Sequence, residues 1–252
     1  MELCSLTDAA RQNIAQTYIG LARELPDTRV IDHPNFVGTI SLRPYSFCNF
    51  ILGFNGEEAD LELITAEVDR WARLQPAMRI FIISGDEPRG LTEAMLGAEF
   101  APLHRMVQMV WFPARTLGRE EWHECAGPEF RHEVSEFMVK QFFSMNEAGF
   151  RQLVVEATAS GTHELWYISE NDSIIAAAMV APSPHALGIY NVCVDSSKRR
   201  RGYGSSLMRS AQLHAFERGT PLVLQCDEKL SSWYRELGFQ VFGEMQSFQR
   251  RI

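Results

Sequence analysis

The residues with the clearest chemical potential form a basic, glycine-containing segment. Four consecutive cations, Lys198–Arg201, precede Gly202 and Gly204, and a helical pattern follows them. Backbone N–H groups at a helix N-terminus bind anions, because they lack internal partners and lie at the positive end of the helix dipole. Glycines there remove side chains that would hold a phosphate away from these donors. The segment predicts a pyrophosphate-binding turn, although by itself it also fits a solvated basic turn with two ordinary glycines.

A dinucleotide-binding fingerprint is an alternative explanation for these glycines. The run Gly202–Leu207 has two of the three glycines of the G-x-G-x-x-G pattern, and Asp227 lies where a ribose-binding acid would be expected. However, Leu207 takes the place of the third glycine, and only 25 residues follow Asp227. Because this remainder is too short for the further strands of such a sheet, the dinucleotide interpretation is set aside.

A second segment, Ser231–Phe239, follows the next predicted strand. Together the two segments resemble the GNAT superfamily of acyl-CoA-dependent N-acyltransferases, whose members carry a V-x-P-x-x-R-x-x-G-x-G loop and, further along, a Y-x-x-x-G-F helix ending. The matching residues are Val194, Arg199, Gly202, Gly204, Tyr234, Gly238 and Phe239. The resemblance covers residues 120–252.

The sequence departs from the family pattern at three positions. Ser196 stands where the family often has proline, and Arg200 stands where it often has glycine. Glu228 lies six residues before Tyr234, where many relatives carry an asparagine that contacts the pantetheine arm. This chain therefore lacks the asparagine that makes the pantetheine contact in many relatives.

The resemblance implies a site that uses acetyl-CoA as acyl donor. Backbone amides and arginine side chains would hold the pyrophosphate of coenzyme A, and the residues concerned are Arg199, Arg200, Arg201, Gly202, Tyr203, Gly204 and Ser205. The strand edge at Val192, Cys193 and Val194 would pair with the pantetheine amides and direct one N–H at the thioester oxygen. Tyr234 would protonate the leaving thiolate. A primary amine, as a small molecule or on a peptide, would attack the thioester directly.

The base that accepts the proton of the amine is not identified by the sequence. His185, Glu164 and Tyr190 lie on or near the predicted central strands, and each is expected to be structural or solvated. Cys193 has the chemistry of a nucleophile. The apolar strand around it favours a small buried hydrophobic side chain instead.

The elements that must position these residues follow from hydrophobic periodicity. In the C-terminal half the patterns predict two helices, three antiparallel-type strands, and then helix, strand, helix and strand. The approximate ranges are 130–138, 150–157, 164–169, 173–181, 187–194, 205–218, 222–226, 231–237 and 239–248. We therefore expect an α/β (α+β) fold with a GNAT-like mixed, mostly antiparallel central sheet flanked by helices.

The N-terminal half shows a weaker version of the element order predicted for the C-terminal half. Strand, helix, strand, helix and strand patterns follow one another at 46–54, 61–71, 78–84, 91–96 and 103–112. Phe100 follows Leu52 by 48 residues, and Phe239 follows Val194 by 45. This spacing predicts an internal duplication, with chance similarity of two α/β segments as the alternative. The expected domains are a degenerate GNAT-like unit at 1–116 and the N-acetyltransferase domain at 117–252.

The N-terminal counterpart of the basic turn is acidic. The segment Gly53–Asp60 contains three carboxylates and no arginine. Coulomb repulsion would keep a pyrophosphate away from it. We therefore expect the N-terminal unit to have lost coenzyme A binding and to wall one side of the acceptor site.

Composition limits the remaining function classes. The 252 residues carry a net charge of −8, which argues against a nucleic-acid partner. The five cysteines form no C-x-x-C pair, and no H-E-x-x-H motif is present, so no metal is expected. No apolar stretch is long enough to span a membrane, and no secretory signal is visible, which predicts a cytoplasmic protein. A duplicated chain predicts a monomer, because it satisfies internally the contacts that single-domain relatives make by dimerising.

Two functions are consistent with these features. The first is an acetyl-CoA-dependent N-acetyltransferase with one active site in residues 120–252. The second is a catalytically inactive coenzyme A sensor or protein-interaction module on the same fold. Acetylation of amines, measured as thiol release, would separate the two.

Overall fold

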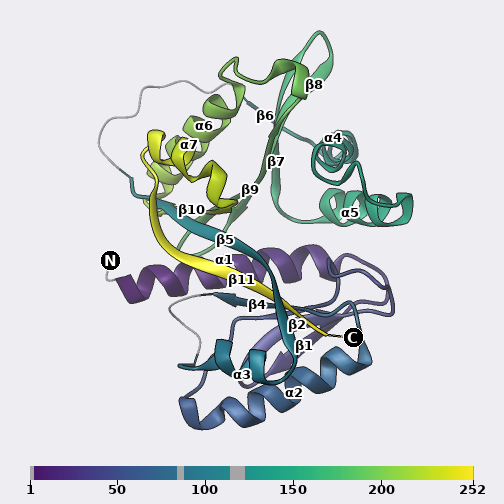
Figure 1. Ribbon diagram of the computed structural model, residues 1–252. Helices are drawn as coiled ribbons and strands as arrows, with labels where there is room; N and C mark the ends of the chain where they lie inside the picture. The colour runs from purple at the N-terminus through teal and green to yellow at the C-terminus, as the bar shows by residue number, and fades with distance from the viewer. Residues whose placement is uncertain (1–2, 84–87, 114–122, 252) are drawn as a thin grey trace. The chain divides into compact units, whose positions relative to one another are not determined.

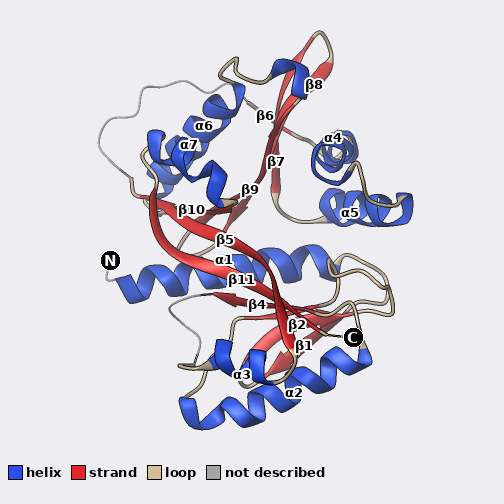
Figure 2. Ribbon diagram, viewed as in Figure 1, coloured by secondary structure: helices blue, strands red, loops and turns tan. Residues whose placement is uncertain are grey.

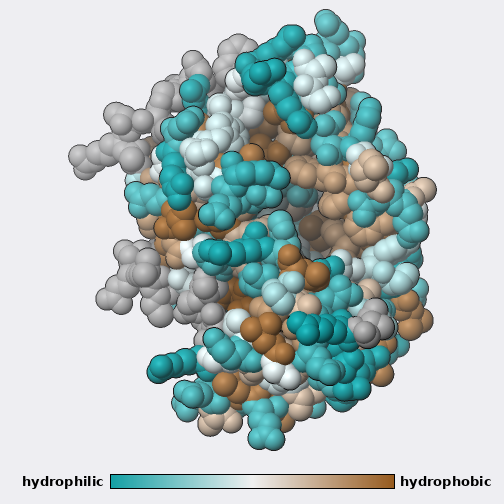
Figure 3. Space-filling view, in the orientation of Figure 1, coloured by the Kyte–Doolittle hydropathy of each residue, from teal (hydrophilic) through white to brown (hydrophobic). Residues whose placement is uncertain are grey.

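The computed structural model describes residues 3–83, 88–113 and 123–251 (Figure 1). Contacts along the chain group it into two units. Unit 1 comprises Met1–Gln108, Gln225–Glu228 and Phe242–Ile252, and unit 2 comprises Met109–Leu224 and Lys229–Val241. Within the described ranges, no helix is both long and apolar enough to cross a membrane. Polar and apolar side chains are interspersed over the face drawn in Figure 3.

Unit 2 is built on antiparallel strands that are covered by helices. Its elements are β6 (Glu124–Cys125), α4 (Arg131–Phe143), α5 (Ala148–Ser160), β7 (Glu164–Glu170), β8 (Ser173–Pro182), β9 (Leu187–Val194), the 3-10 turn η2 (Ser196–Lys198), α6 (Tyr203–Arg218), β10 (Leu222–Cys226), the 3-10 turn η3 (Glu228–Leu230) and α7 (Ser231–Glu236). Figure 2 shows α4 and α5 on one side of the strands and α6 and α7 on the other. Because both faces are covered, the apolar run of β8 is buried at seven consecutive positions.

The strand order in unit 2 is β6-β7-β8-β9-β10. The first four strands pair antiparallel, and β9 pairs parallel with β10. The structure therefore confirms the predicted sequence of helices and strands in this half and its mostly antiparallel sheet.

Unit 1 has a similar set of elements. They are α1 (Leu3–Arg23), β1 (Arg29–His33), β2 (Phe36–Ile40), β3 (Phe50–Leu52), the 3-10 turn η1 (Glu58–Asp60), α2 (Leu61–Leu74), β4 (Arg79–Ile83), α3 (Leu91–Gly97), β5 (Phe100–Trp111) and β11 (Gln240–Arg250). Their strand order is β1-β2-β3-β4-β11-β5. The last part of β5 and the first residues of β11 belong to unit 2.

The element order of the two halves repeats, as the spacing predicted. The order α1-β1-β2-β3-α2-β4-α3-β5 in the first half is matched by α5-β7-β8-β9-α6-β10-α7-β11 in the second. In both halves the third strand leads through a 3-10 turn into the longer crossover helix. The repetition therefore extends from the spacing to the order of whole elements.

Some elements of the first half differ from the sequence prediction. The patterns did not indicate α1, whose buried face includes the polar residues Asn13 and Thr17, because these interrupt the apolar period. The strands β1 and β2 were also missed. The strand expected at 46–54 is limited to β3, because the Asn49 side chain bonds the carbonyls of Arg43 and Tyr45 and holds the preceding residues in a turn.

The C-terminal strand completes the core of unit 1. In β11, Met245 lies opposite Ile83 of β4, and Phe248 lies opposite Ile80. Phe248 is 1% exposed and belongs to the same apolar cluster as residues of β2, α2 and α3. The boundary expected at 116/117 lies outside the described residues. The compact units differ from that division mainly in grouping Gln225–Glu228 and Phe242–Ile252 with unit 1.

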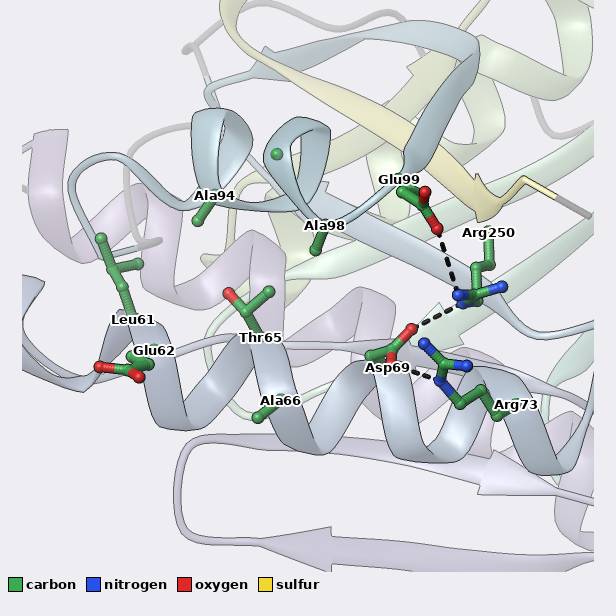
Figure 4. Close-up of a pocket in the computed structure, with 11 residues that line it drawn as sticks. Leu61, Glu62, Thr65, Ala66, Asp69, Arg73, Ala94, Ala98, Glu99 and Arg250 are labelled. Atoms are coloured by element: carbon green, nitrogen blue, oxygen red, sulfur yellow. Dashed lines mark hydrogen bonds and ion pairs between the residues drawn. The ribbon is translucent and has the colours of Figure 1, made fainter.

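Ion pairs fasten the end of β11 to α2 (Figure 4). The Arg250 Nε donates to Asp69 at 2.6 Å, and Arg73 donates to the other oxygen of the same carboxylate at 2.6 Å. Burial opposes ionisation of Asp69, but hydrogen bonds from the two arginines outweigh it and lower its pKa. The Arg250 side chain also reaches Glu99 at 3.3 Å. These charges close one end of a groove of about 530 Å³ between α2 and α3.

Replacing Phe248 by alanine is expected to destabilise unit 1. Truncating a fully buried phenylalanine removes apolar contact and leaves a cavity, which costs about 3–5 kcal/mol. Thermal or denaturant unfolding of the full chain measures this loss. The control is Val241→Ala on the same strand, where the side chain is 42% exposed and little change is expected. Equal effects of the two variants would contradict the assignment of Phe248 to the core.

Candidate functional site

The site begins where β9 departs from regular pairing. Tyr190 lies opposite Met179 of β8 while Cys193 lies opposite Ala177, so β9 has an extra residue in this interval. Asn191 has a φ of +51°, which asparagine tolerates better than most residues. This is a β-bulge, and it bends the strand locally.

The bulge accompanies a separation of β9 from β10. Among the described residues, parallel pairing of these strands is recorded at Leu187 and Gly188 of β9 alone. The edge of Val192–Val194 that is directed away from β8 therefore has no recorded strand partner among the described residues, and the Val194 carbonyl accepts a hydrogen bond from Arg199 Nε at 3.3 Å. An open strand edge presents backbone N–H and C=O groups that an extended molecule can pair with.

The loop after β9 is shaped by Asp195. Its carboxylate accepts hydrogen bonds from the hydroxyl of Ser197 at 2.6 Å and from the backbone N–H of the same residue at 2.8 Å. These two bonds lower the pKa of Asp195. The chain then passes through left-handed conformations at Arg200, with φ +62°, and at Gly202, with φ +90°, before α6 begins at Tyr203.

The two glycines of the loop have different roles. A Cβ at Gly202 would meet no atom within 4 Å, but its φ of +90° is unfavourable for any other residue. Gly204 has no positive φ, and a Cβ there would lie 3.5 Å from Trp233 and 3.6 Å from Val194, which is ordinary contact. Protein packing therefore does not require glycine at 204. Its effect is to leave the first turn of α6 bare toward the adjoining cavity.

A cavity of about 470 Å³ brings the predicted site residues together. It is lined by ten of the eleven, namely Val192, Cys193, Val194, Arg199, Arg200, Gly202, Tyr203, Gly204, Ser205 and Tyr234. Arg201 is exposed and is not among the lining residues. The lining includes three cations, Lys198, Arg199 and Arg200, and no carboxylate. The cavity therefore favours an anionic ligand.

Five further lining residues were not among the eleven predicted site residues, although Lys198 belongs to the basic run that predicted the turn. Lys198, Leu230 and Trp233 adjoin the two motifs, and their positions beside motif residues were the available signal. Gln141 and Phe142 come from the end of α4, far from both motifs in the sequence. No local pattern could have identified these two, because only the packing of α4 brings them to the cavity.

The position of Tyr234 is set by the way α7 ends. Gly238 has a φ of +87°, its N–H donates to Arg235 O at 2.9 Å, and the N–H of Phe239 donates to Tyr234 O at 3.0 Å. This is the Schellman arrangement that commonly ends a helix at glycine. The Phe239 ring packs edge-on against Tyr234 with a centroid separation of 5.8 Å. Tyr234 is thus 7% exposed and is held against the wall of the cavity.

Cys193 lies in the cavity wall but is not a competent nucleophile. Burial raises the pKa of its thiol to about 12, and the sulfur lies 3.6 Å from the carbonyl oxygen of Ala177. The thiol is therefore protonated at neutral pH, whereas nucleophilic attack requires the thiolate. None of the three residues considered as a base, His185, Glu164 and Tyr190, lines the cavity.

The corresponding turn of the first half is filled by its own carboxylate. The Asp60 side chain accepts the backbone N–H of Glu57 at 2.9 Å. A Cβ at Gly56 would lie 2.9 Å from the same carboxylate. An anion from solution would therefore meet both the negative charge and the bulk of Asp60.

The C-terminal part of the chain matches a known family. Residues 161–241 match the model of the acetyltransferase (GNAT) domain, a range that includes the bulged strand, the basic loop and Tyr234. The search of curated proteins found no match for the sequence. The GNAT resemblance that the two motifs predicted is thereby confirmed for this part of the chain.

The whole chain shares its fold with solved acetyltransferases. A GCN5-related N-acetyltransferase from Kribbella flavida aligns with a TM-score of 0.66 at 18% identity, over 97% of this chain and 96% of that one. A GCN5-related N-acetyltransferase from Sphaerobacter thermophilus gives a TM-score of 0.60 at 15% identity, over 98% and 93%. An acetyltransferase of the GNAT family from Colwellia psychrerythraea gives 0.55 at 13%, over 89% and 85%. At these identities the likeness establishes the fold.

Alanine substitutions at the two glycines are expected to affect stability differently. Gly202→Ala should cost about 1–2 kcal/mol, because a Cβ is disfavoured at positive φ. Gly204→Ala should be neutral or stabilise by up to about 1 kcal/mol, since the position is helical and has room. Denaturant unfolding of both variants tests this difference. Equal destabilisation by the two substitutions would contradict the roles assigned to them.

Proposed function

We propose that this chain, which carries a GNAT acetyltransferase domain, transfers the acetyl group of acetyl-CoA to a primary amine in a ternary complex. The observation that carries the proposal is the cavity where the open edge of β9, the basic loop and Tyr234 meet. The proposed catalytic domain is residues 117–252, and residues 1–116 are a degenerate GNAT-like domain. Acyl transfer from acyl-CoA is the chemistry that the family match supports.

Coenzyme A fits the residues that are present. Its diphosphate would be bound by the backbone amides of Arg200–Ser205, because the bare first turn at Gly204 admits it to the positive end of α6. Arg199 and the exposed arginines beside it would screen the charge. The amides of the pantetheine arm would pair with the open edge at Val192–Val194, as an added strand pairs with a sheet.

The acetyl transfer would then proceed by direct attack. The amine nitrogen forms a bond to the thioester carbonyl carbon, and a backbone N–H of the β9 edge stabilises the negative charge that develops on the oxygen. The carbon–sulfur bond breaks, and the Tyr234 hydroxyl gives its proton to the sulfur. The nitrogen releases its extra proton to solvent, and the Tyr234 phenolate takes a proton back from solvent. Direct attack by the amine needs no cysteine-linked acetyl intermediate. Such an intermediate is also unfavourable, because the Cys193 thiol is protonated.

Calorimetry with coenzyme A tests the binding half of the proposal. We expect saturable binding of one molecule per chain, because Asp60 fills the corresponding turn of the first half. Gly204→Glu should abolish the binding heat, since it places bulk and negative charge on the first turn of α6. Circular dichroism verifies that the variant is folded. No binding to the folded wild-type chain would overturn the proposed function.

Thiol release from acetyl-CoA with a panel of amines tests the catalytic half. Tyr234→Phe is expected to lower kcat about 100-fold with little change in KM, because general-acid catalysis contributes about 10²–10⁴-fold and a thiolate is a fair leaving group. Tyr167→Phe is the control, since its hydroxyl bonds Glu124 and it does not line the cavity. Binding without acetylation of polyamines, amino acids, antibiotics or peptides would favour an inactive coenzyme A sensor.

A further inference from the structure

A carboxylate outside both motifs contacts two residues of the cavity wall. Glu170 ends β7, and one of its oxygens accepts a hydrogen bond from Lys198 Nζ at 2.5 Å. Its other oxygen accepts the hydroxyl of Tyr203. Lys198 and Tyr203 both line the cavity, whereas Glu170 does not. We call these two contacts the Glu170 bridge.

The bridge spans the part of the loop with the least favourable backbone. Lys198 precedes this part and Tyr203 follows it, and between them lie Arg200 at φ +62° and Gly202 at φ +90°. A left-handed conformation is disfavoured for a residue with a Cβ such as Arg200. Such a conformation persists only when the surrounding structure holds it in place.

The loop also carries a concentrated positive charge that opposes its own compact form. Lys198–Arg201 are four successive cations. Glu170 interacts with Lys198 and Arg201, while Asp195 also interacts with Lys198. Hydrogen bonds from Lys198 and Tyr203 lower the pKa of Glu170. At neutral pH it is therefore ionised and counters the repulsion within the loop.

The anchor of the bridge is itself well fixed. The β7–β8 hairpin closes through Asn171 and Asp172, both at positive φ, in a two-residue turn between Glu170 and Ser173. The register irregularity in this hairpin leaves Ile175 without an opposite residue, and its carbonyl accepts the N–H of Asp195 at 2.8 Å. The start of the loop is thus bound to the same hairpin that provides Glu170.

From these contacts we infer that Glu170 is a positioning residue for coenzyme A, holding the basic loop in its anion-binding conformation before the ligand arrives. The inference rests on the proposed function. Glu170 does not itself line the cavity, and it acts through its contacts with Lys198 and Tyr203. A preorganised loop loses less conformational freedom when the diphosphate binds, so affinity is higher than for a mobile loop.

The sign of the effect distinguishes positioning from simple electrostatics. If Glu170 acted only through its charge, removing it would strengthen the binding of an anion. Positioning predicts the opposite result. We expect Glu170→Ala to raise the Kd of coenzyme A about tenfold, which corresponds to about 1.4 kcal/mol. The kcat at saturation should stay within about twofold, because the reacting atoms are untouched.

Two further variants sharpen this test in calorimetry. Glu170→Gln keeps an oxygen that can accept from Tyr203 or Lys198, so a smaller loss than that of Glu170→Ala is expected, and it also serves if the alanine variant is unstable. Asp172→Asn is the matched control. It removes the same charge from the same hairpin, and asparagine tolerates the positive φ there. This control should bind coenzyme A as tightly as the wild type or slightly more tightly.

A measurement without ligand separates this inference from the proposed function. Amide hydrogen exchange in residues 199–205 of the free protein should be faster in Glu170→Ala than in Asp172→Asn, because the loop opens more often. Unchanged exchange, or equal or tighter coenzyme A binding by a folded Glu170→Ala variant, would overturn the inference and leave the proposed function standing. Absence of coenzyme A binding by the wild type would instead remove the proposed function.

Discussion

The structure of the candidate site depends on backbone hydrogen-bonding groups that have been left available. A buried or half-buried N–H or C=O without a partner is costly, so folded chains pair nearly all of them. The bulge at Asn191 and the early end of the β9–β10 pairing leave an edge without a strand partner, where Arg199 bonds the Val194 carbonyl. The first turn of α6 adds amides that no helix can satisfy internally. A ligand with amides and a diphosphate would form hydrogen bonds with both the strand edge and the first turn of α6.

Charge is distributed in a way that the net value conceals. The chain is acidic overall, with a net charge of −8, yet the cavity wall has three cations and no carboxylate. The equivalent turn in the first half holds Asp60 against its own backbone. The same order of elements therefore supports opposite electrostatic environments in the two halves, because a few side chains of each turn set its charge.

The last strand also contributes to the stability of unit 1. Unit 1 obtains part of its core from Phe248 and an ion-pair network from Arg250, both near the C-terminus of the chain. The core of the first half is therefore complete only when residues from the end of the chain are included in it. Contacts between residues so distant in sequence require closure of a long loop, which tends to slow folding.

The sequence by itself determined the local features of this protein. Alternating and helical periods located the strands and helices of the second half, and residue type explained the Gly202 turn, the Gly238 helix ending and the placement of Tyr234, because each depends on interactions within a few residues. Tertiary structure decided what depends on distant neighbours. Only in the folded chain is the polar Asn13 of α1 buried and Phe248 part of the core of unit 1. The packing of α4 likewise places Phe142 in the cavity wall. Tertiary structure also placed Glu170 against Lys198 and Tyr203. The sequence could not predict this contact, because Glu170 and Lys198 are 28 residues apart in the chain.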